Sequence, residues 1–156
     1  MSLIKMGTKQ TPASIFFTHS AEETIEVGKQ IAHLLQEGDI VFLFGDLGSG
    51  KTTLTKGLIT ELTNTSMQEI TSPTFTYLNT YSGVKKVHHF DLYRLSSPHE
   101  FLDAGFHEFL SEEAICCIEW PDKLPQGIKE TYRIEILYEE KNTRKITLYP
   151  GSSHAS

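Results

Sequence analysis

Residues 40–52 read IVFLFGDLGSGKT, and they carry the clearest structural signal in the chain. From Gly45 to Thr52 the sequence fits the pattern G-x-x-x-x-G-K-[ST] at every position. The apolar residues at 40–44 are too few for a buried helix and are typical of a central strand covered on both faces. After the pattern, leucines recur at helical spacing over residues 52–62. A strand, a glycine-rich loop and an amphipathic helix in this order predict a phosphate-binding loop.

Each residue type in this loop has a chemical reason to be there. Glycines let the backbone adopt positive φ angles and come close to phosphate oxygens. Successive amides then point inward as an anion-binding nest, and the N-terminus of the next helix adds a positive dipole end. We expect the Lys51 ammonium between the β- and γ-phosphates and the Thr52 hydroxyl on Mg²⁺. The motif thus predicts a nucleoside triphosphate site and leaves open whether the phosphate goes to water or to a second substrate.

Composition excludes several classes of protein. The 156 residues suffice for one domain, and 14 Lys and Arg against 20 Asp and Glu give a net charge of −6. Unaided binding to nucleic acid or to an anionic membrane surface is therefore not expected. No apolar run approaches the roughly 20 residues of a membrane-spanning helix, and the first residues lack the apolar segment of a secretory signal. The adjacent Cys116 and Cys117 lie in an apolar run, which indicates reduced core residues and a cytoplasmic protein.

The rest of the chain alternates between strand-like and helix-like patterns. Ser20 and Ser97 each precede a glutamate by three residues, which is the capping box of a helix start, and the helices are expected to end near Gly38 and Gly105. Strand-like runs occupy residues 14–18, 75–81, 87–92, 114–118, 132–138 and 144–149. We therefore expect an α/β fold: a single P-loop NTPase-like domain with a mixed, partly parallel sheet flanked by helices and a C-terminal β-hairpin. Its expected bounds are residues 13–150, with flexible termini at 1–12 and 151–156.

Two carboxylates are candidates for the Mg²⁺ site, because a phosphate-loop protein needs an acid at the end of a nearby strand. Glu119 follows the apolar run at 114–118, and Asp91 follows the less apolar residues 87–90. Glu119 fits the metal-holding role better. Asp91 is then expected near the γ-phosphate, where it would orient the attacking water or a metal-bound water.

Two further residues have open interpretations. Trp120 is either a rim residue that packs over a loop or a lid near the nucleotide. Thr74 lies in a Ser-Pro-Thr segment that can sense a γ-phosphate, although its spacing alone favours a plain turn.

The remaining motifs narrow the class of nucleotide protein. No Asn-Lys-x-Asp element for guanine occurs, so ATP is the default nucleotide. Small-molecule kinases close an arginine-rich lid, and this chain has only Arg94, Arg133 and Arg144. The seven histidines show no tight zinc-ligand spacing. These residues favour a minimal ATPase that needs a partner to complete its site.

Four strings in this order resemble the TsaE family, formerly YjeE. They are GDLGSGKTT from Gly45, TSPTFT from Thr71, HFDLYRL from His89 and IEWP from Ile118. The last two are specific to that family, and the resemblance covers roughly residues 14–148. Ser49 stands where the family commonly has alanine, which we expect to be tolerated because that position contributes mainly its backbone.

The resemblance implies a cytoplasmic ATPase of bacterial tRNA threonylcarbamoyladenosine synthesis, with ATP and Mg²⁺ as cofactors. Its implied partner is the TsaB–TsaD heterodimer, which attaches the threonylcarbamoyl group to the adenosine beside the anticodon. ATP hydrolysis would reset that pair between turnovers. The chain would meet tRNA only indirectly, through the complex, and would not meet a membrane.

The resemblance also assigns roles to residues. It makes Asp91 and Lys51 catalytic, and it places Mg²⁺ on Thr52 and Glu119. Nucleotide contacts are implied for Gly45, Asp46, Leu47, Gly48, Ser49, Gly50, Lys51, Thr52, Thr53, Thr74 and Trp120. Two alternatives remain: a nucleotide-gated binding module with incidental hydrolysis, and a small-molecule kinase.

Overall fold

A computed structural model describes residues 11–111 and 113–152. The strands are β1 (Ser14–Thr18), β2 (Ile40–Phe44), β3 (Leu78–Ser82), β4 (Lys86–Asp91), β5 (Ile115–Glu119), β6 (Tyr132–Tyr138) and β7 (Arg144–Pro150). The α-helices are α1 (Ala21–Ala32), α2 (Lys51–Thr63) and α3 (Pro98–Asp103). Short 3₁₀ helices are η2 (Met67–Glu69), η3 (Phe106–Ser111) and η4 (Pro121–Lys123). No helix in these two described ranges is long and apolar enough to span a bilayer.

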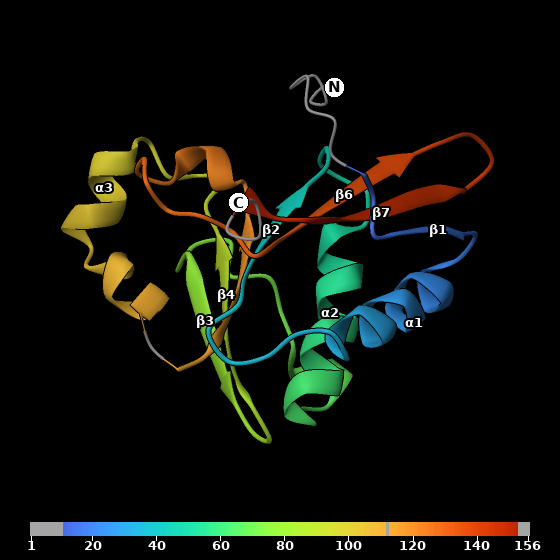
Figure 1. The fold of residues 1–156 in the computed structure, drawn as a ribbon, viewed down its shortest axis with the longest axis horizontal. Helices are drawn as coiled ribbons and strands as arrows, with labels where there is room; N and C mark the ends of the chain where they lie inside the picture. The colour runs from blue at the N-terminus through green and yellow to red at the C-terminus, as the bar shows by residue number, and fades with distance from the viewer. Residues whose placement is uncertain (1–10, 112, 153–156) are drawn as a thin grey trace.

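The strands form one mixed sheet in the order β1-β7-β6-β2-β5-β4-β3. The central strand β2 is parallel to both neighbours, β5 and β6, and β4 is parallel to β5. Antiparallel strands complete both sides: β3 beside β4, and the β6–β7 hairpin with β1. Helices α1 and α2 cover one face, and α3 with η3 covers the other (Figure 1). The predicted α/β sheet, partly parallel with a C-terminal hairpin, is confirmed.

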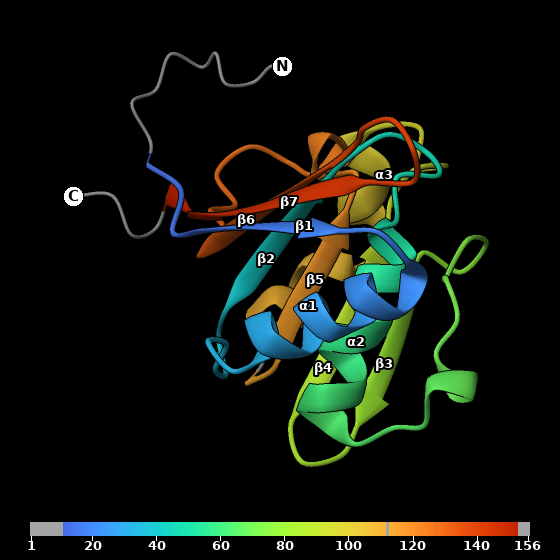
Figure 2. The ribbon, with the colours of Figure 1, turned by 90° about the vertical axis from the view of Figure 1, so that its right-hand side faces the viewer.

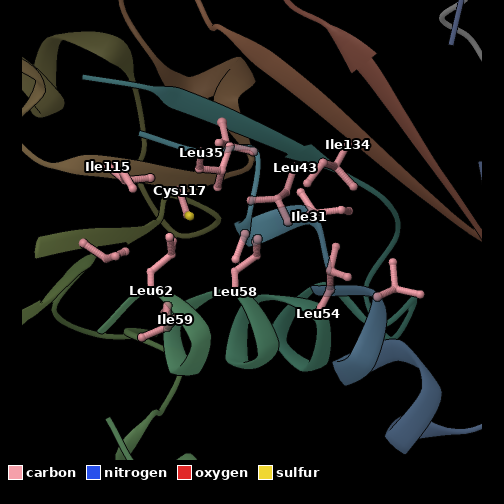
Figure 3. Packing of buried hydrophobic residues seen from close by; sticks show 14 of the residues in the cluster. Ile31, Leu35, Leu43, Leu54, Leu58, Ile59, Leu62, Ile115, Cys117 and Ile134 are labelled. Atoms are coloured by element: carbon pink, nitrogen blue, oxygen red, sulfur yellow. The ribbon is translucent and has the colours of Figure 1, made fainter. Parts of the chain in front are cut away.

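Helix α2 packs against the sheet through its leucines. Leu54, Leu58 and Leu62 point towards the strands, where they meet Leu43 of β2 and Cys117 of β5 (Figure 3). Burying each such side chain contributes about 1.5–3 kcal/mol. This packing holds the first turn of α2 next to the carboxyl ends of β2 and β5.

Helix α1 crosses α2 at two glycines, with the backbones in close contact (Figure 2). A Cβ added at Gly28 would lie 2.4 Å from the Leu54 carbonyl oxygen, and one added at Gly57 would lie 2.2 Å from that of Ile25. No side chain larger than hydrogen fits this crossing without a shift of one helix.

Both predicted helix starts are confirmed, with one difference in the caps. Ser20 accepts a hydrogen bond from the Glu23 amide, but the Glu23 carboxylate reaches the amide of His19, one residue earlier than in the usual capping box. Helix α3 repeats the arrangement: the Glu100 carboxylate accepts from the amide and hydroxyl of Ser96. These two hydrogen bonds lower the pKa of Glu100.

Two element boundaries differ from the sequence prediction by three or more residues. The strand expected over 75–81 begins only at Leu78, because Tyr77 adopts a left-handed turn with φ 68°. The helix expected to continue to Gly38 ends at Ala32. The predicted flexible termini, 1–12 and 151–156, lie mostly outside the described residues. Of the described part, Gly151 is buried and its amide donates to the Thr131 carbonyl (2.8 Å), so this residue is held against the domain.

Candidate functional site

The glycine-rich loop joins the carboxyl end of β2 to the first turn of α2. Gly48 and Gly50 have φ angles of 81° and 114°, which residues with a side chain rarely adopt. Gly50 is the N-cap, and α2 begins at Lys51. The amides of the first helical turn have no partner within the helix and carry the positive end of its dipole. The loop therefore presents donors and partial positive charge to one end of the sheet.

A cavity of about 490 Å³ opens beside this loop. It brings together ten of the predicted site residues: Leu47, Gly48, Gly50, Lys51, Thr52, Thr53, Thr74, Asp91, Glu119 and Trp120. Asp46 and Ser49 instead line an adjacent cavity of about 570 Å³, on the side of the β6–β7 hairpin. The remaining predicted residue, Gly45, contributes its carbonyl to Lys51.

The Lys51 side chain is folded back into its own loop. Its Nζ donates to the Gly45 carbonyl and lies 3.8 Å from the centroid of the Trp120 ring. The residue is only 5% exposed. Burial lowers the pKa of Lys51, and the nearby carboxylates, Glu119 first and then Asp91, act in the opposite direction. Trp120 itself has a left-handed backbone (φ 61°), and its ring packs against that of Tyr93 with centroids 4.9 Å apart and planes tilted by 50°.

The two predicted carboxylates lie side by side at the ends of neighbouring strands. Asp91 of β4 pairs in register with Glu119 of β5, and Glu119 also pairs with Leu43 of β2. Glu119 is 3% exposed, and its Oε2 lies 2.7 Å from Nε2 of His89. Because carboxyl ends of parallel strands share one edge, both acids face the loop that follows β2.

Asp91 is held by two donors. Its Oδ2 accepts from the Ser72 hydroxyl at 3.2 Å, and its Oδ1 accepts from the Tyr93 amide at 3.1 Å. The Thr74 hydroxyl in turn lies 3.5 Å from the Ser72 hydroxyl. The segment that contains Thr74 is therefore linked to Asp91 through Ser72.

The donor set fits Mg²⁺ better than a transition metal. Magnesium prefers oxygen ligands and is usually held by one or two carboxylates, waters and substrate phosphates. Glu119 Oε2 is taken by His89, and within the described residues no hydrogen bond reaches its Oε1. Across residues 11–111 and 113–152, no group of three or more His, Cys, Asp or Glu side chains forms a cage for a metal. Thr52 and Glu119 thus suit a cation that takes its remaining ligands from phosphate and water.

The fold also brings to the site Ser72, Tyr93 and Arg144, which were not among the predicted site residues. The Arg144 Nε of β7 donates to the Ser49 carbonyl at 2.6 Å, and its guanidinium lies 4.4 Å from the centroid of the Tyr138 ring. Residues Ser72, Tyr93 and Arg94 line the main cavity, as Arg144 does. Ser72, Tyr93 and Arg94 lie inside the strings TSPTFT and HFDLYRL, so the family resemblance could have indicated them as site residues. Arg144 lies outside the four strings, and no sequence pattern indicated it.

Comparisons with known proteins identify the family of this chain. The family model described as "Threonylcarbamoyl adenosine biosynthesis protein TsaE" matches residues 18–146. The tRNA threonylcarbamoyladenosine biosynthesis protein TsaE of Treponema pallidum is 38% identical over 84% of this chain and 96% of its own length. The Bacillus subtilis protein of the same name is 37% identical over 83% of this chain and 81% of its own.

A solved structure shares the fold. The crystal structure of Bacillus subtilis YdiB superposes with a TM-score of 0.67 at 32% identity, covering 88% of this chain and 84% of that one. The resemblance inferred from the four sequence strings is confirmed. This chain belongs to the TsaE family of tRNA threonylcarbamoyladenosine biosynthesis proteins.

Proposed function

We propose that the chain is a Mg-ATP-dependent ATPase that hydrolyses ATP to reset the TsaB–TsaD transferase complex during threonylcarbamoyladenosine modification of tRNA. One observation carries the proposal: Lys51 and Thr52, at the start of α2, share a cavity with Asp91 and Glu119 from two adjacent strands. This combination of a cation, a hydroxyl, helix-terminal amides and two carboxylates matches what phosphoryl transfer from a nucleotide requires.

Lys51 and the start of α2 would bind the phosphates. The ammonium would exchange the Gly45 carbonyl for phosphate oxygens, and amides of the glycine-rich loop would donate to the others. Burial lowers the pKa of Lys51, and a bound polyphosphate would favour its charged form. The partial burial that disfavours the free cation therefore strengthens its interaction with an anionic ligand.

The two carboxylates would have different roles. Thr52 and Glu119 would hold Mg²⁺, which when bound neutralises charge that develops on the β- and γ-phosphates. Asp91 would orient the attacking water. Its Oδ2 would accept a hydrogen bond from that water once the hydrogen bond from the Ser72 hydroxyl is broken. Thr74, linked to Asp91 through Ser72, would couple this change to the segment between α2 and β3.

Two observations support dependence on a partner. The arginines beside the cavity, Arg94 and Arg144, already contact other groups of this chain, and large apolar side chains beside the cavity are exposed. The Arg94 guanidinium lies 5.1 Å from the Phe75 ring centroid, and Arg144 is bonded to the Ser49 carbonyl. Leu47, which lines the cavity, is 65% exposed, and Phe75 is 79% exposed. Large apolar side chains exposed beside a site are typical of a docking surface.

Reconstitution tests the proposal. Phosphate release by the full chain is measured alone, then with TsaB–TsaD, then with tRNA and threonylcarbamoyl donor, alongside multi-turnover tRNA modification. We expect slow release alone, faster release in the complex, and modification that continues past one turnover only when this chain and ATP are present. No acceleration and no effect on turnover would refute the reset role.

The same assay separates the two alternatives. If Asp91→Asn abolishes phosphate release but leaves multi-turnover modification intact, the chain acts as a nucleotide-gated binding module. If labelled phosphate from ATP appears on an added metabolite instead of in water, the chain acts as a kinase.

A further inference from the structure

Strand β4 carries two adjacent buried histidines that point to opposite faces of the sheet. His88 and His89 are each 1% exposed. His88 faces η3, with its Nδ1 2.8 Å from the Thr80 hydroxyl and its ring 5.0 Å from that of Phe109. His89 faces the α2 side, where its Nε2 meets Glu119. The pair is a natural comparison of two similar side chains in different chemical surroundings.

The contact with Glu119 decides which ring nitrogen of His89 carries the proton. An ionised carboxylate only accepts hydrogen bonds, so Nε2 must be the donor across the 2.7 Å contact. The other nitrogen, Nδ1, is buried and has no hydrogen-bond partner among the described residues. Nε2 therefore carries a proton and donates it to Glu119.

We propose that His89 is a positioning residue for the magnesium carboxylate: it holds Glu119 Oε2 so that Oε1 stays directed at the cation. This inference rests on the proposed function, in which Glu119 binds Mg²⁺. The register supports it, because His89 lies two residues before Asp91 on the same face of β4, while Asp91 pairs directly with Glu119. Partners that orient a metal-binding side chain in this way typically change metal affinity by 10–100-fold when removed.

The contact has no obvious use as packing alone. Both side chains are almost completely buried, and burying a polar pair is often no better for stability than burying apolar residues of similar volume. The neighbouring residues on this face, Val87 and Cys117, belong to the apolar core. A leucine at 89 would extend that core but would leave the Glu119 carboxylate without the one side-chain donor that residues 11–111 and 113–152 give it.

The test measures Mg²⁺ dependence instead of turnover. For the full chain and each variant, a fluorescent ADP analogue is titrated at a series of Mg²⁺ concentrations and also in EDTA. His89→Leu removes the donor and should raise the Mg²⁺ concentration for half-maximal binding about 10–100-fold. Its affinity for the nucleotide in EDTA should stay at the wild-type value. His89→Gln, whose amide nitrogen has the reach of Nε2, should restore the wild-type Mg²⁺ dependence.

His88→Leu is the matched control, because it removes an equally buried histidine from the adjacent position. It should lower thermal stability without changing Mg²⁺ dependence. An unchanged Mg²⁺ dependence in folded His89→Leu, or an equal change in His88→Leu, would overturn the inference. If His89→Leu does not fold, nitrogen NMR of the wild-type rings decides: an Nε2 of His89 without a proton overturns the inference. Absence of Mg²⁺-dependent nucleotide binding by the wild-type chain would instead refute the proposed function.

Discussion

The two faces of strands β4 and β5 differ in chemistry although their residues alternate along the same backbone. The face towards α2 ends in His89, Asp91 and Glu119, next to Lys51. The face towards α3 and η3 is mostly apolar and aromatic: Phe90 of β4 packs with Phe101 of α3 and Phe106 of η3, with ring centroids 5.6–5.8 Å apart, and His88 is a polar residue on this face. These two strands therefore contribute apolar residues to the cores on both faces, and they contribute the catalytic candidates to the face towards α2. Stability and nucleotide chemistry should respond separately to substitutions on the two faces.

The largest effect is expected from Asp91→Asn, on the polar face. The amide keeps the shape of the side chain but cannot take a proton from water, so phosphate release in the presence of TsaB–TsaD should fall about 10²–10⁴-fold. Binding of Mg-ADP, followed by calorimetry, should change little. A variant that hydrolyses ATP at the wild-type rate would remove Asp91 from the chemistry and weaken the contrast between the faces.

On the apolar face, Phe101→Ala should cost about 3–5 kcal/mol in the free energy of unfolding, because a fully buried ring is replaced by a cavity. Nucleotide affinity of the folded fraction should stay at the wild-type value. Urea denaturation with and without Mg-ADP measures both quantities. Loss of affinity at temperatures where the variant is folded would show that the two faces are coupled.

Lys51→Ala should weaken Mg-ADP binding by about 1.5–3 kcal/mol, since it removes a charged hydrogen bond to phosphate. Thermal stability should not fall, because burial lowers the pKa of Lys51 and no carboxylate of the described residues forms a salt bridge with its ammonium. Lys56→Ala, on the same helix, is the control and should bind normally. Equal affinities for the two variants would contradict a phosphate role for Lys51.

A smaller effect is expected where the hairpin supports the glycine-rich loop. Arg144→Gln removes the Nε donor to the Ser49 carbonyl and should weaken Mg-ADP binding by about 1 kcal/mol, since that is the usual net contribution of one hydrogen bond. Lys145→Gln changes the next residue, which points to the other face, and serves as the control. Calorimetry on both variants checks the result; identical affinities would mean that the loop keeps its shape without the arginine.

Much of the polar face was predictable because its signals are local. The glycine-rich loop, the strand before it and the helix after it were identified from spacing alone, and Glu119 and Asp91 were identified as acids that end strands. The hairpin and both capped helix starts were equally visible. The prediction was wrong at residues 75–77, where apolar and aromatic residues suggested a strand but Tyr77 turns the chain.

Local pattern and tertiary structure thus determined different things. The sequence by itself determined the loop, the candidate phosphate ligands and the alternation of strands and helices, because backbone geometry and side-chain period act over a few residues. Only the tertiary structure decided that β2 lies between β5 and β6, that His89 bonds Glu119, and that Arg144 reaches Ser49. Those contacts join residues 30 to 95 positions apart, and their register follows from hydrogen-bonded pairing and packing of the whole sheet.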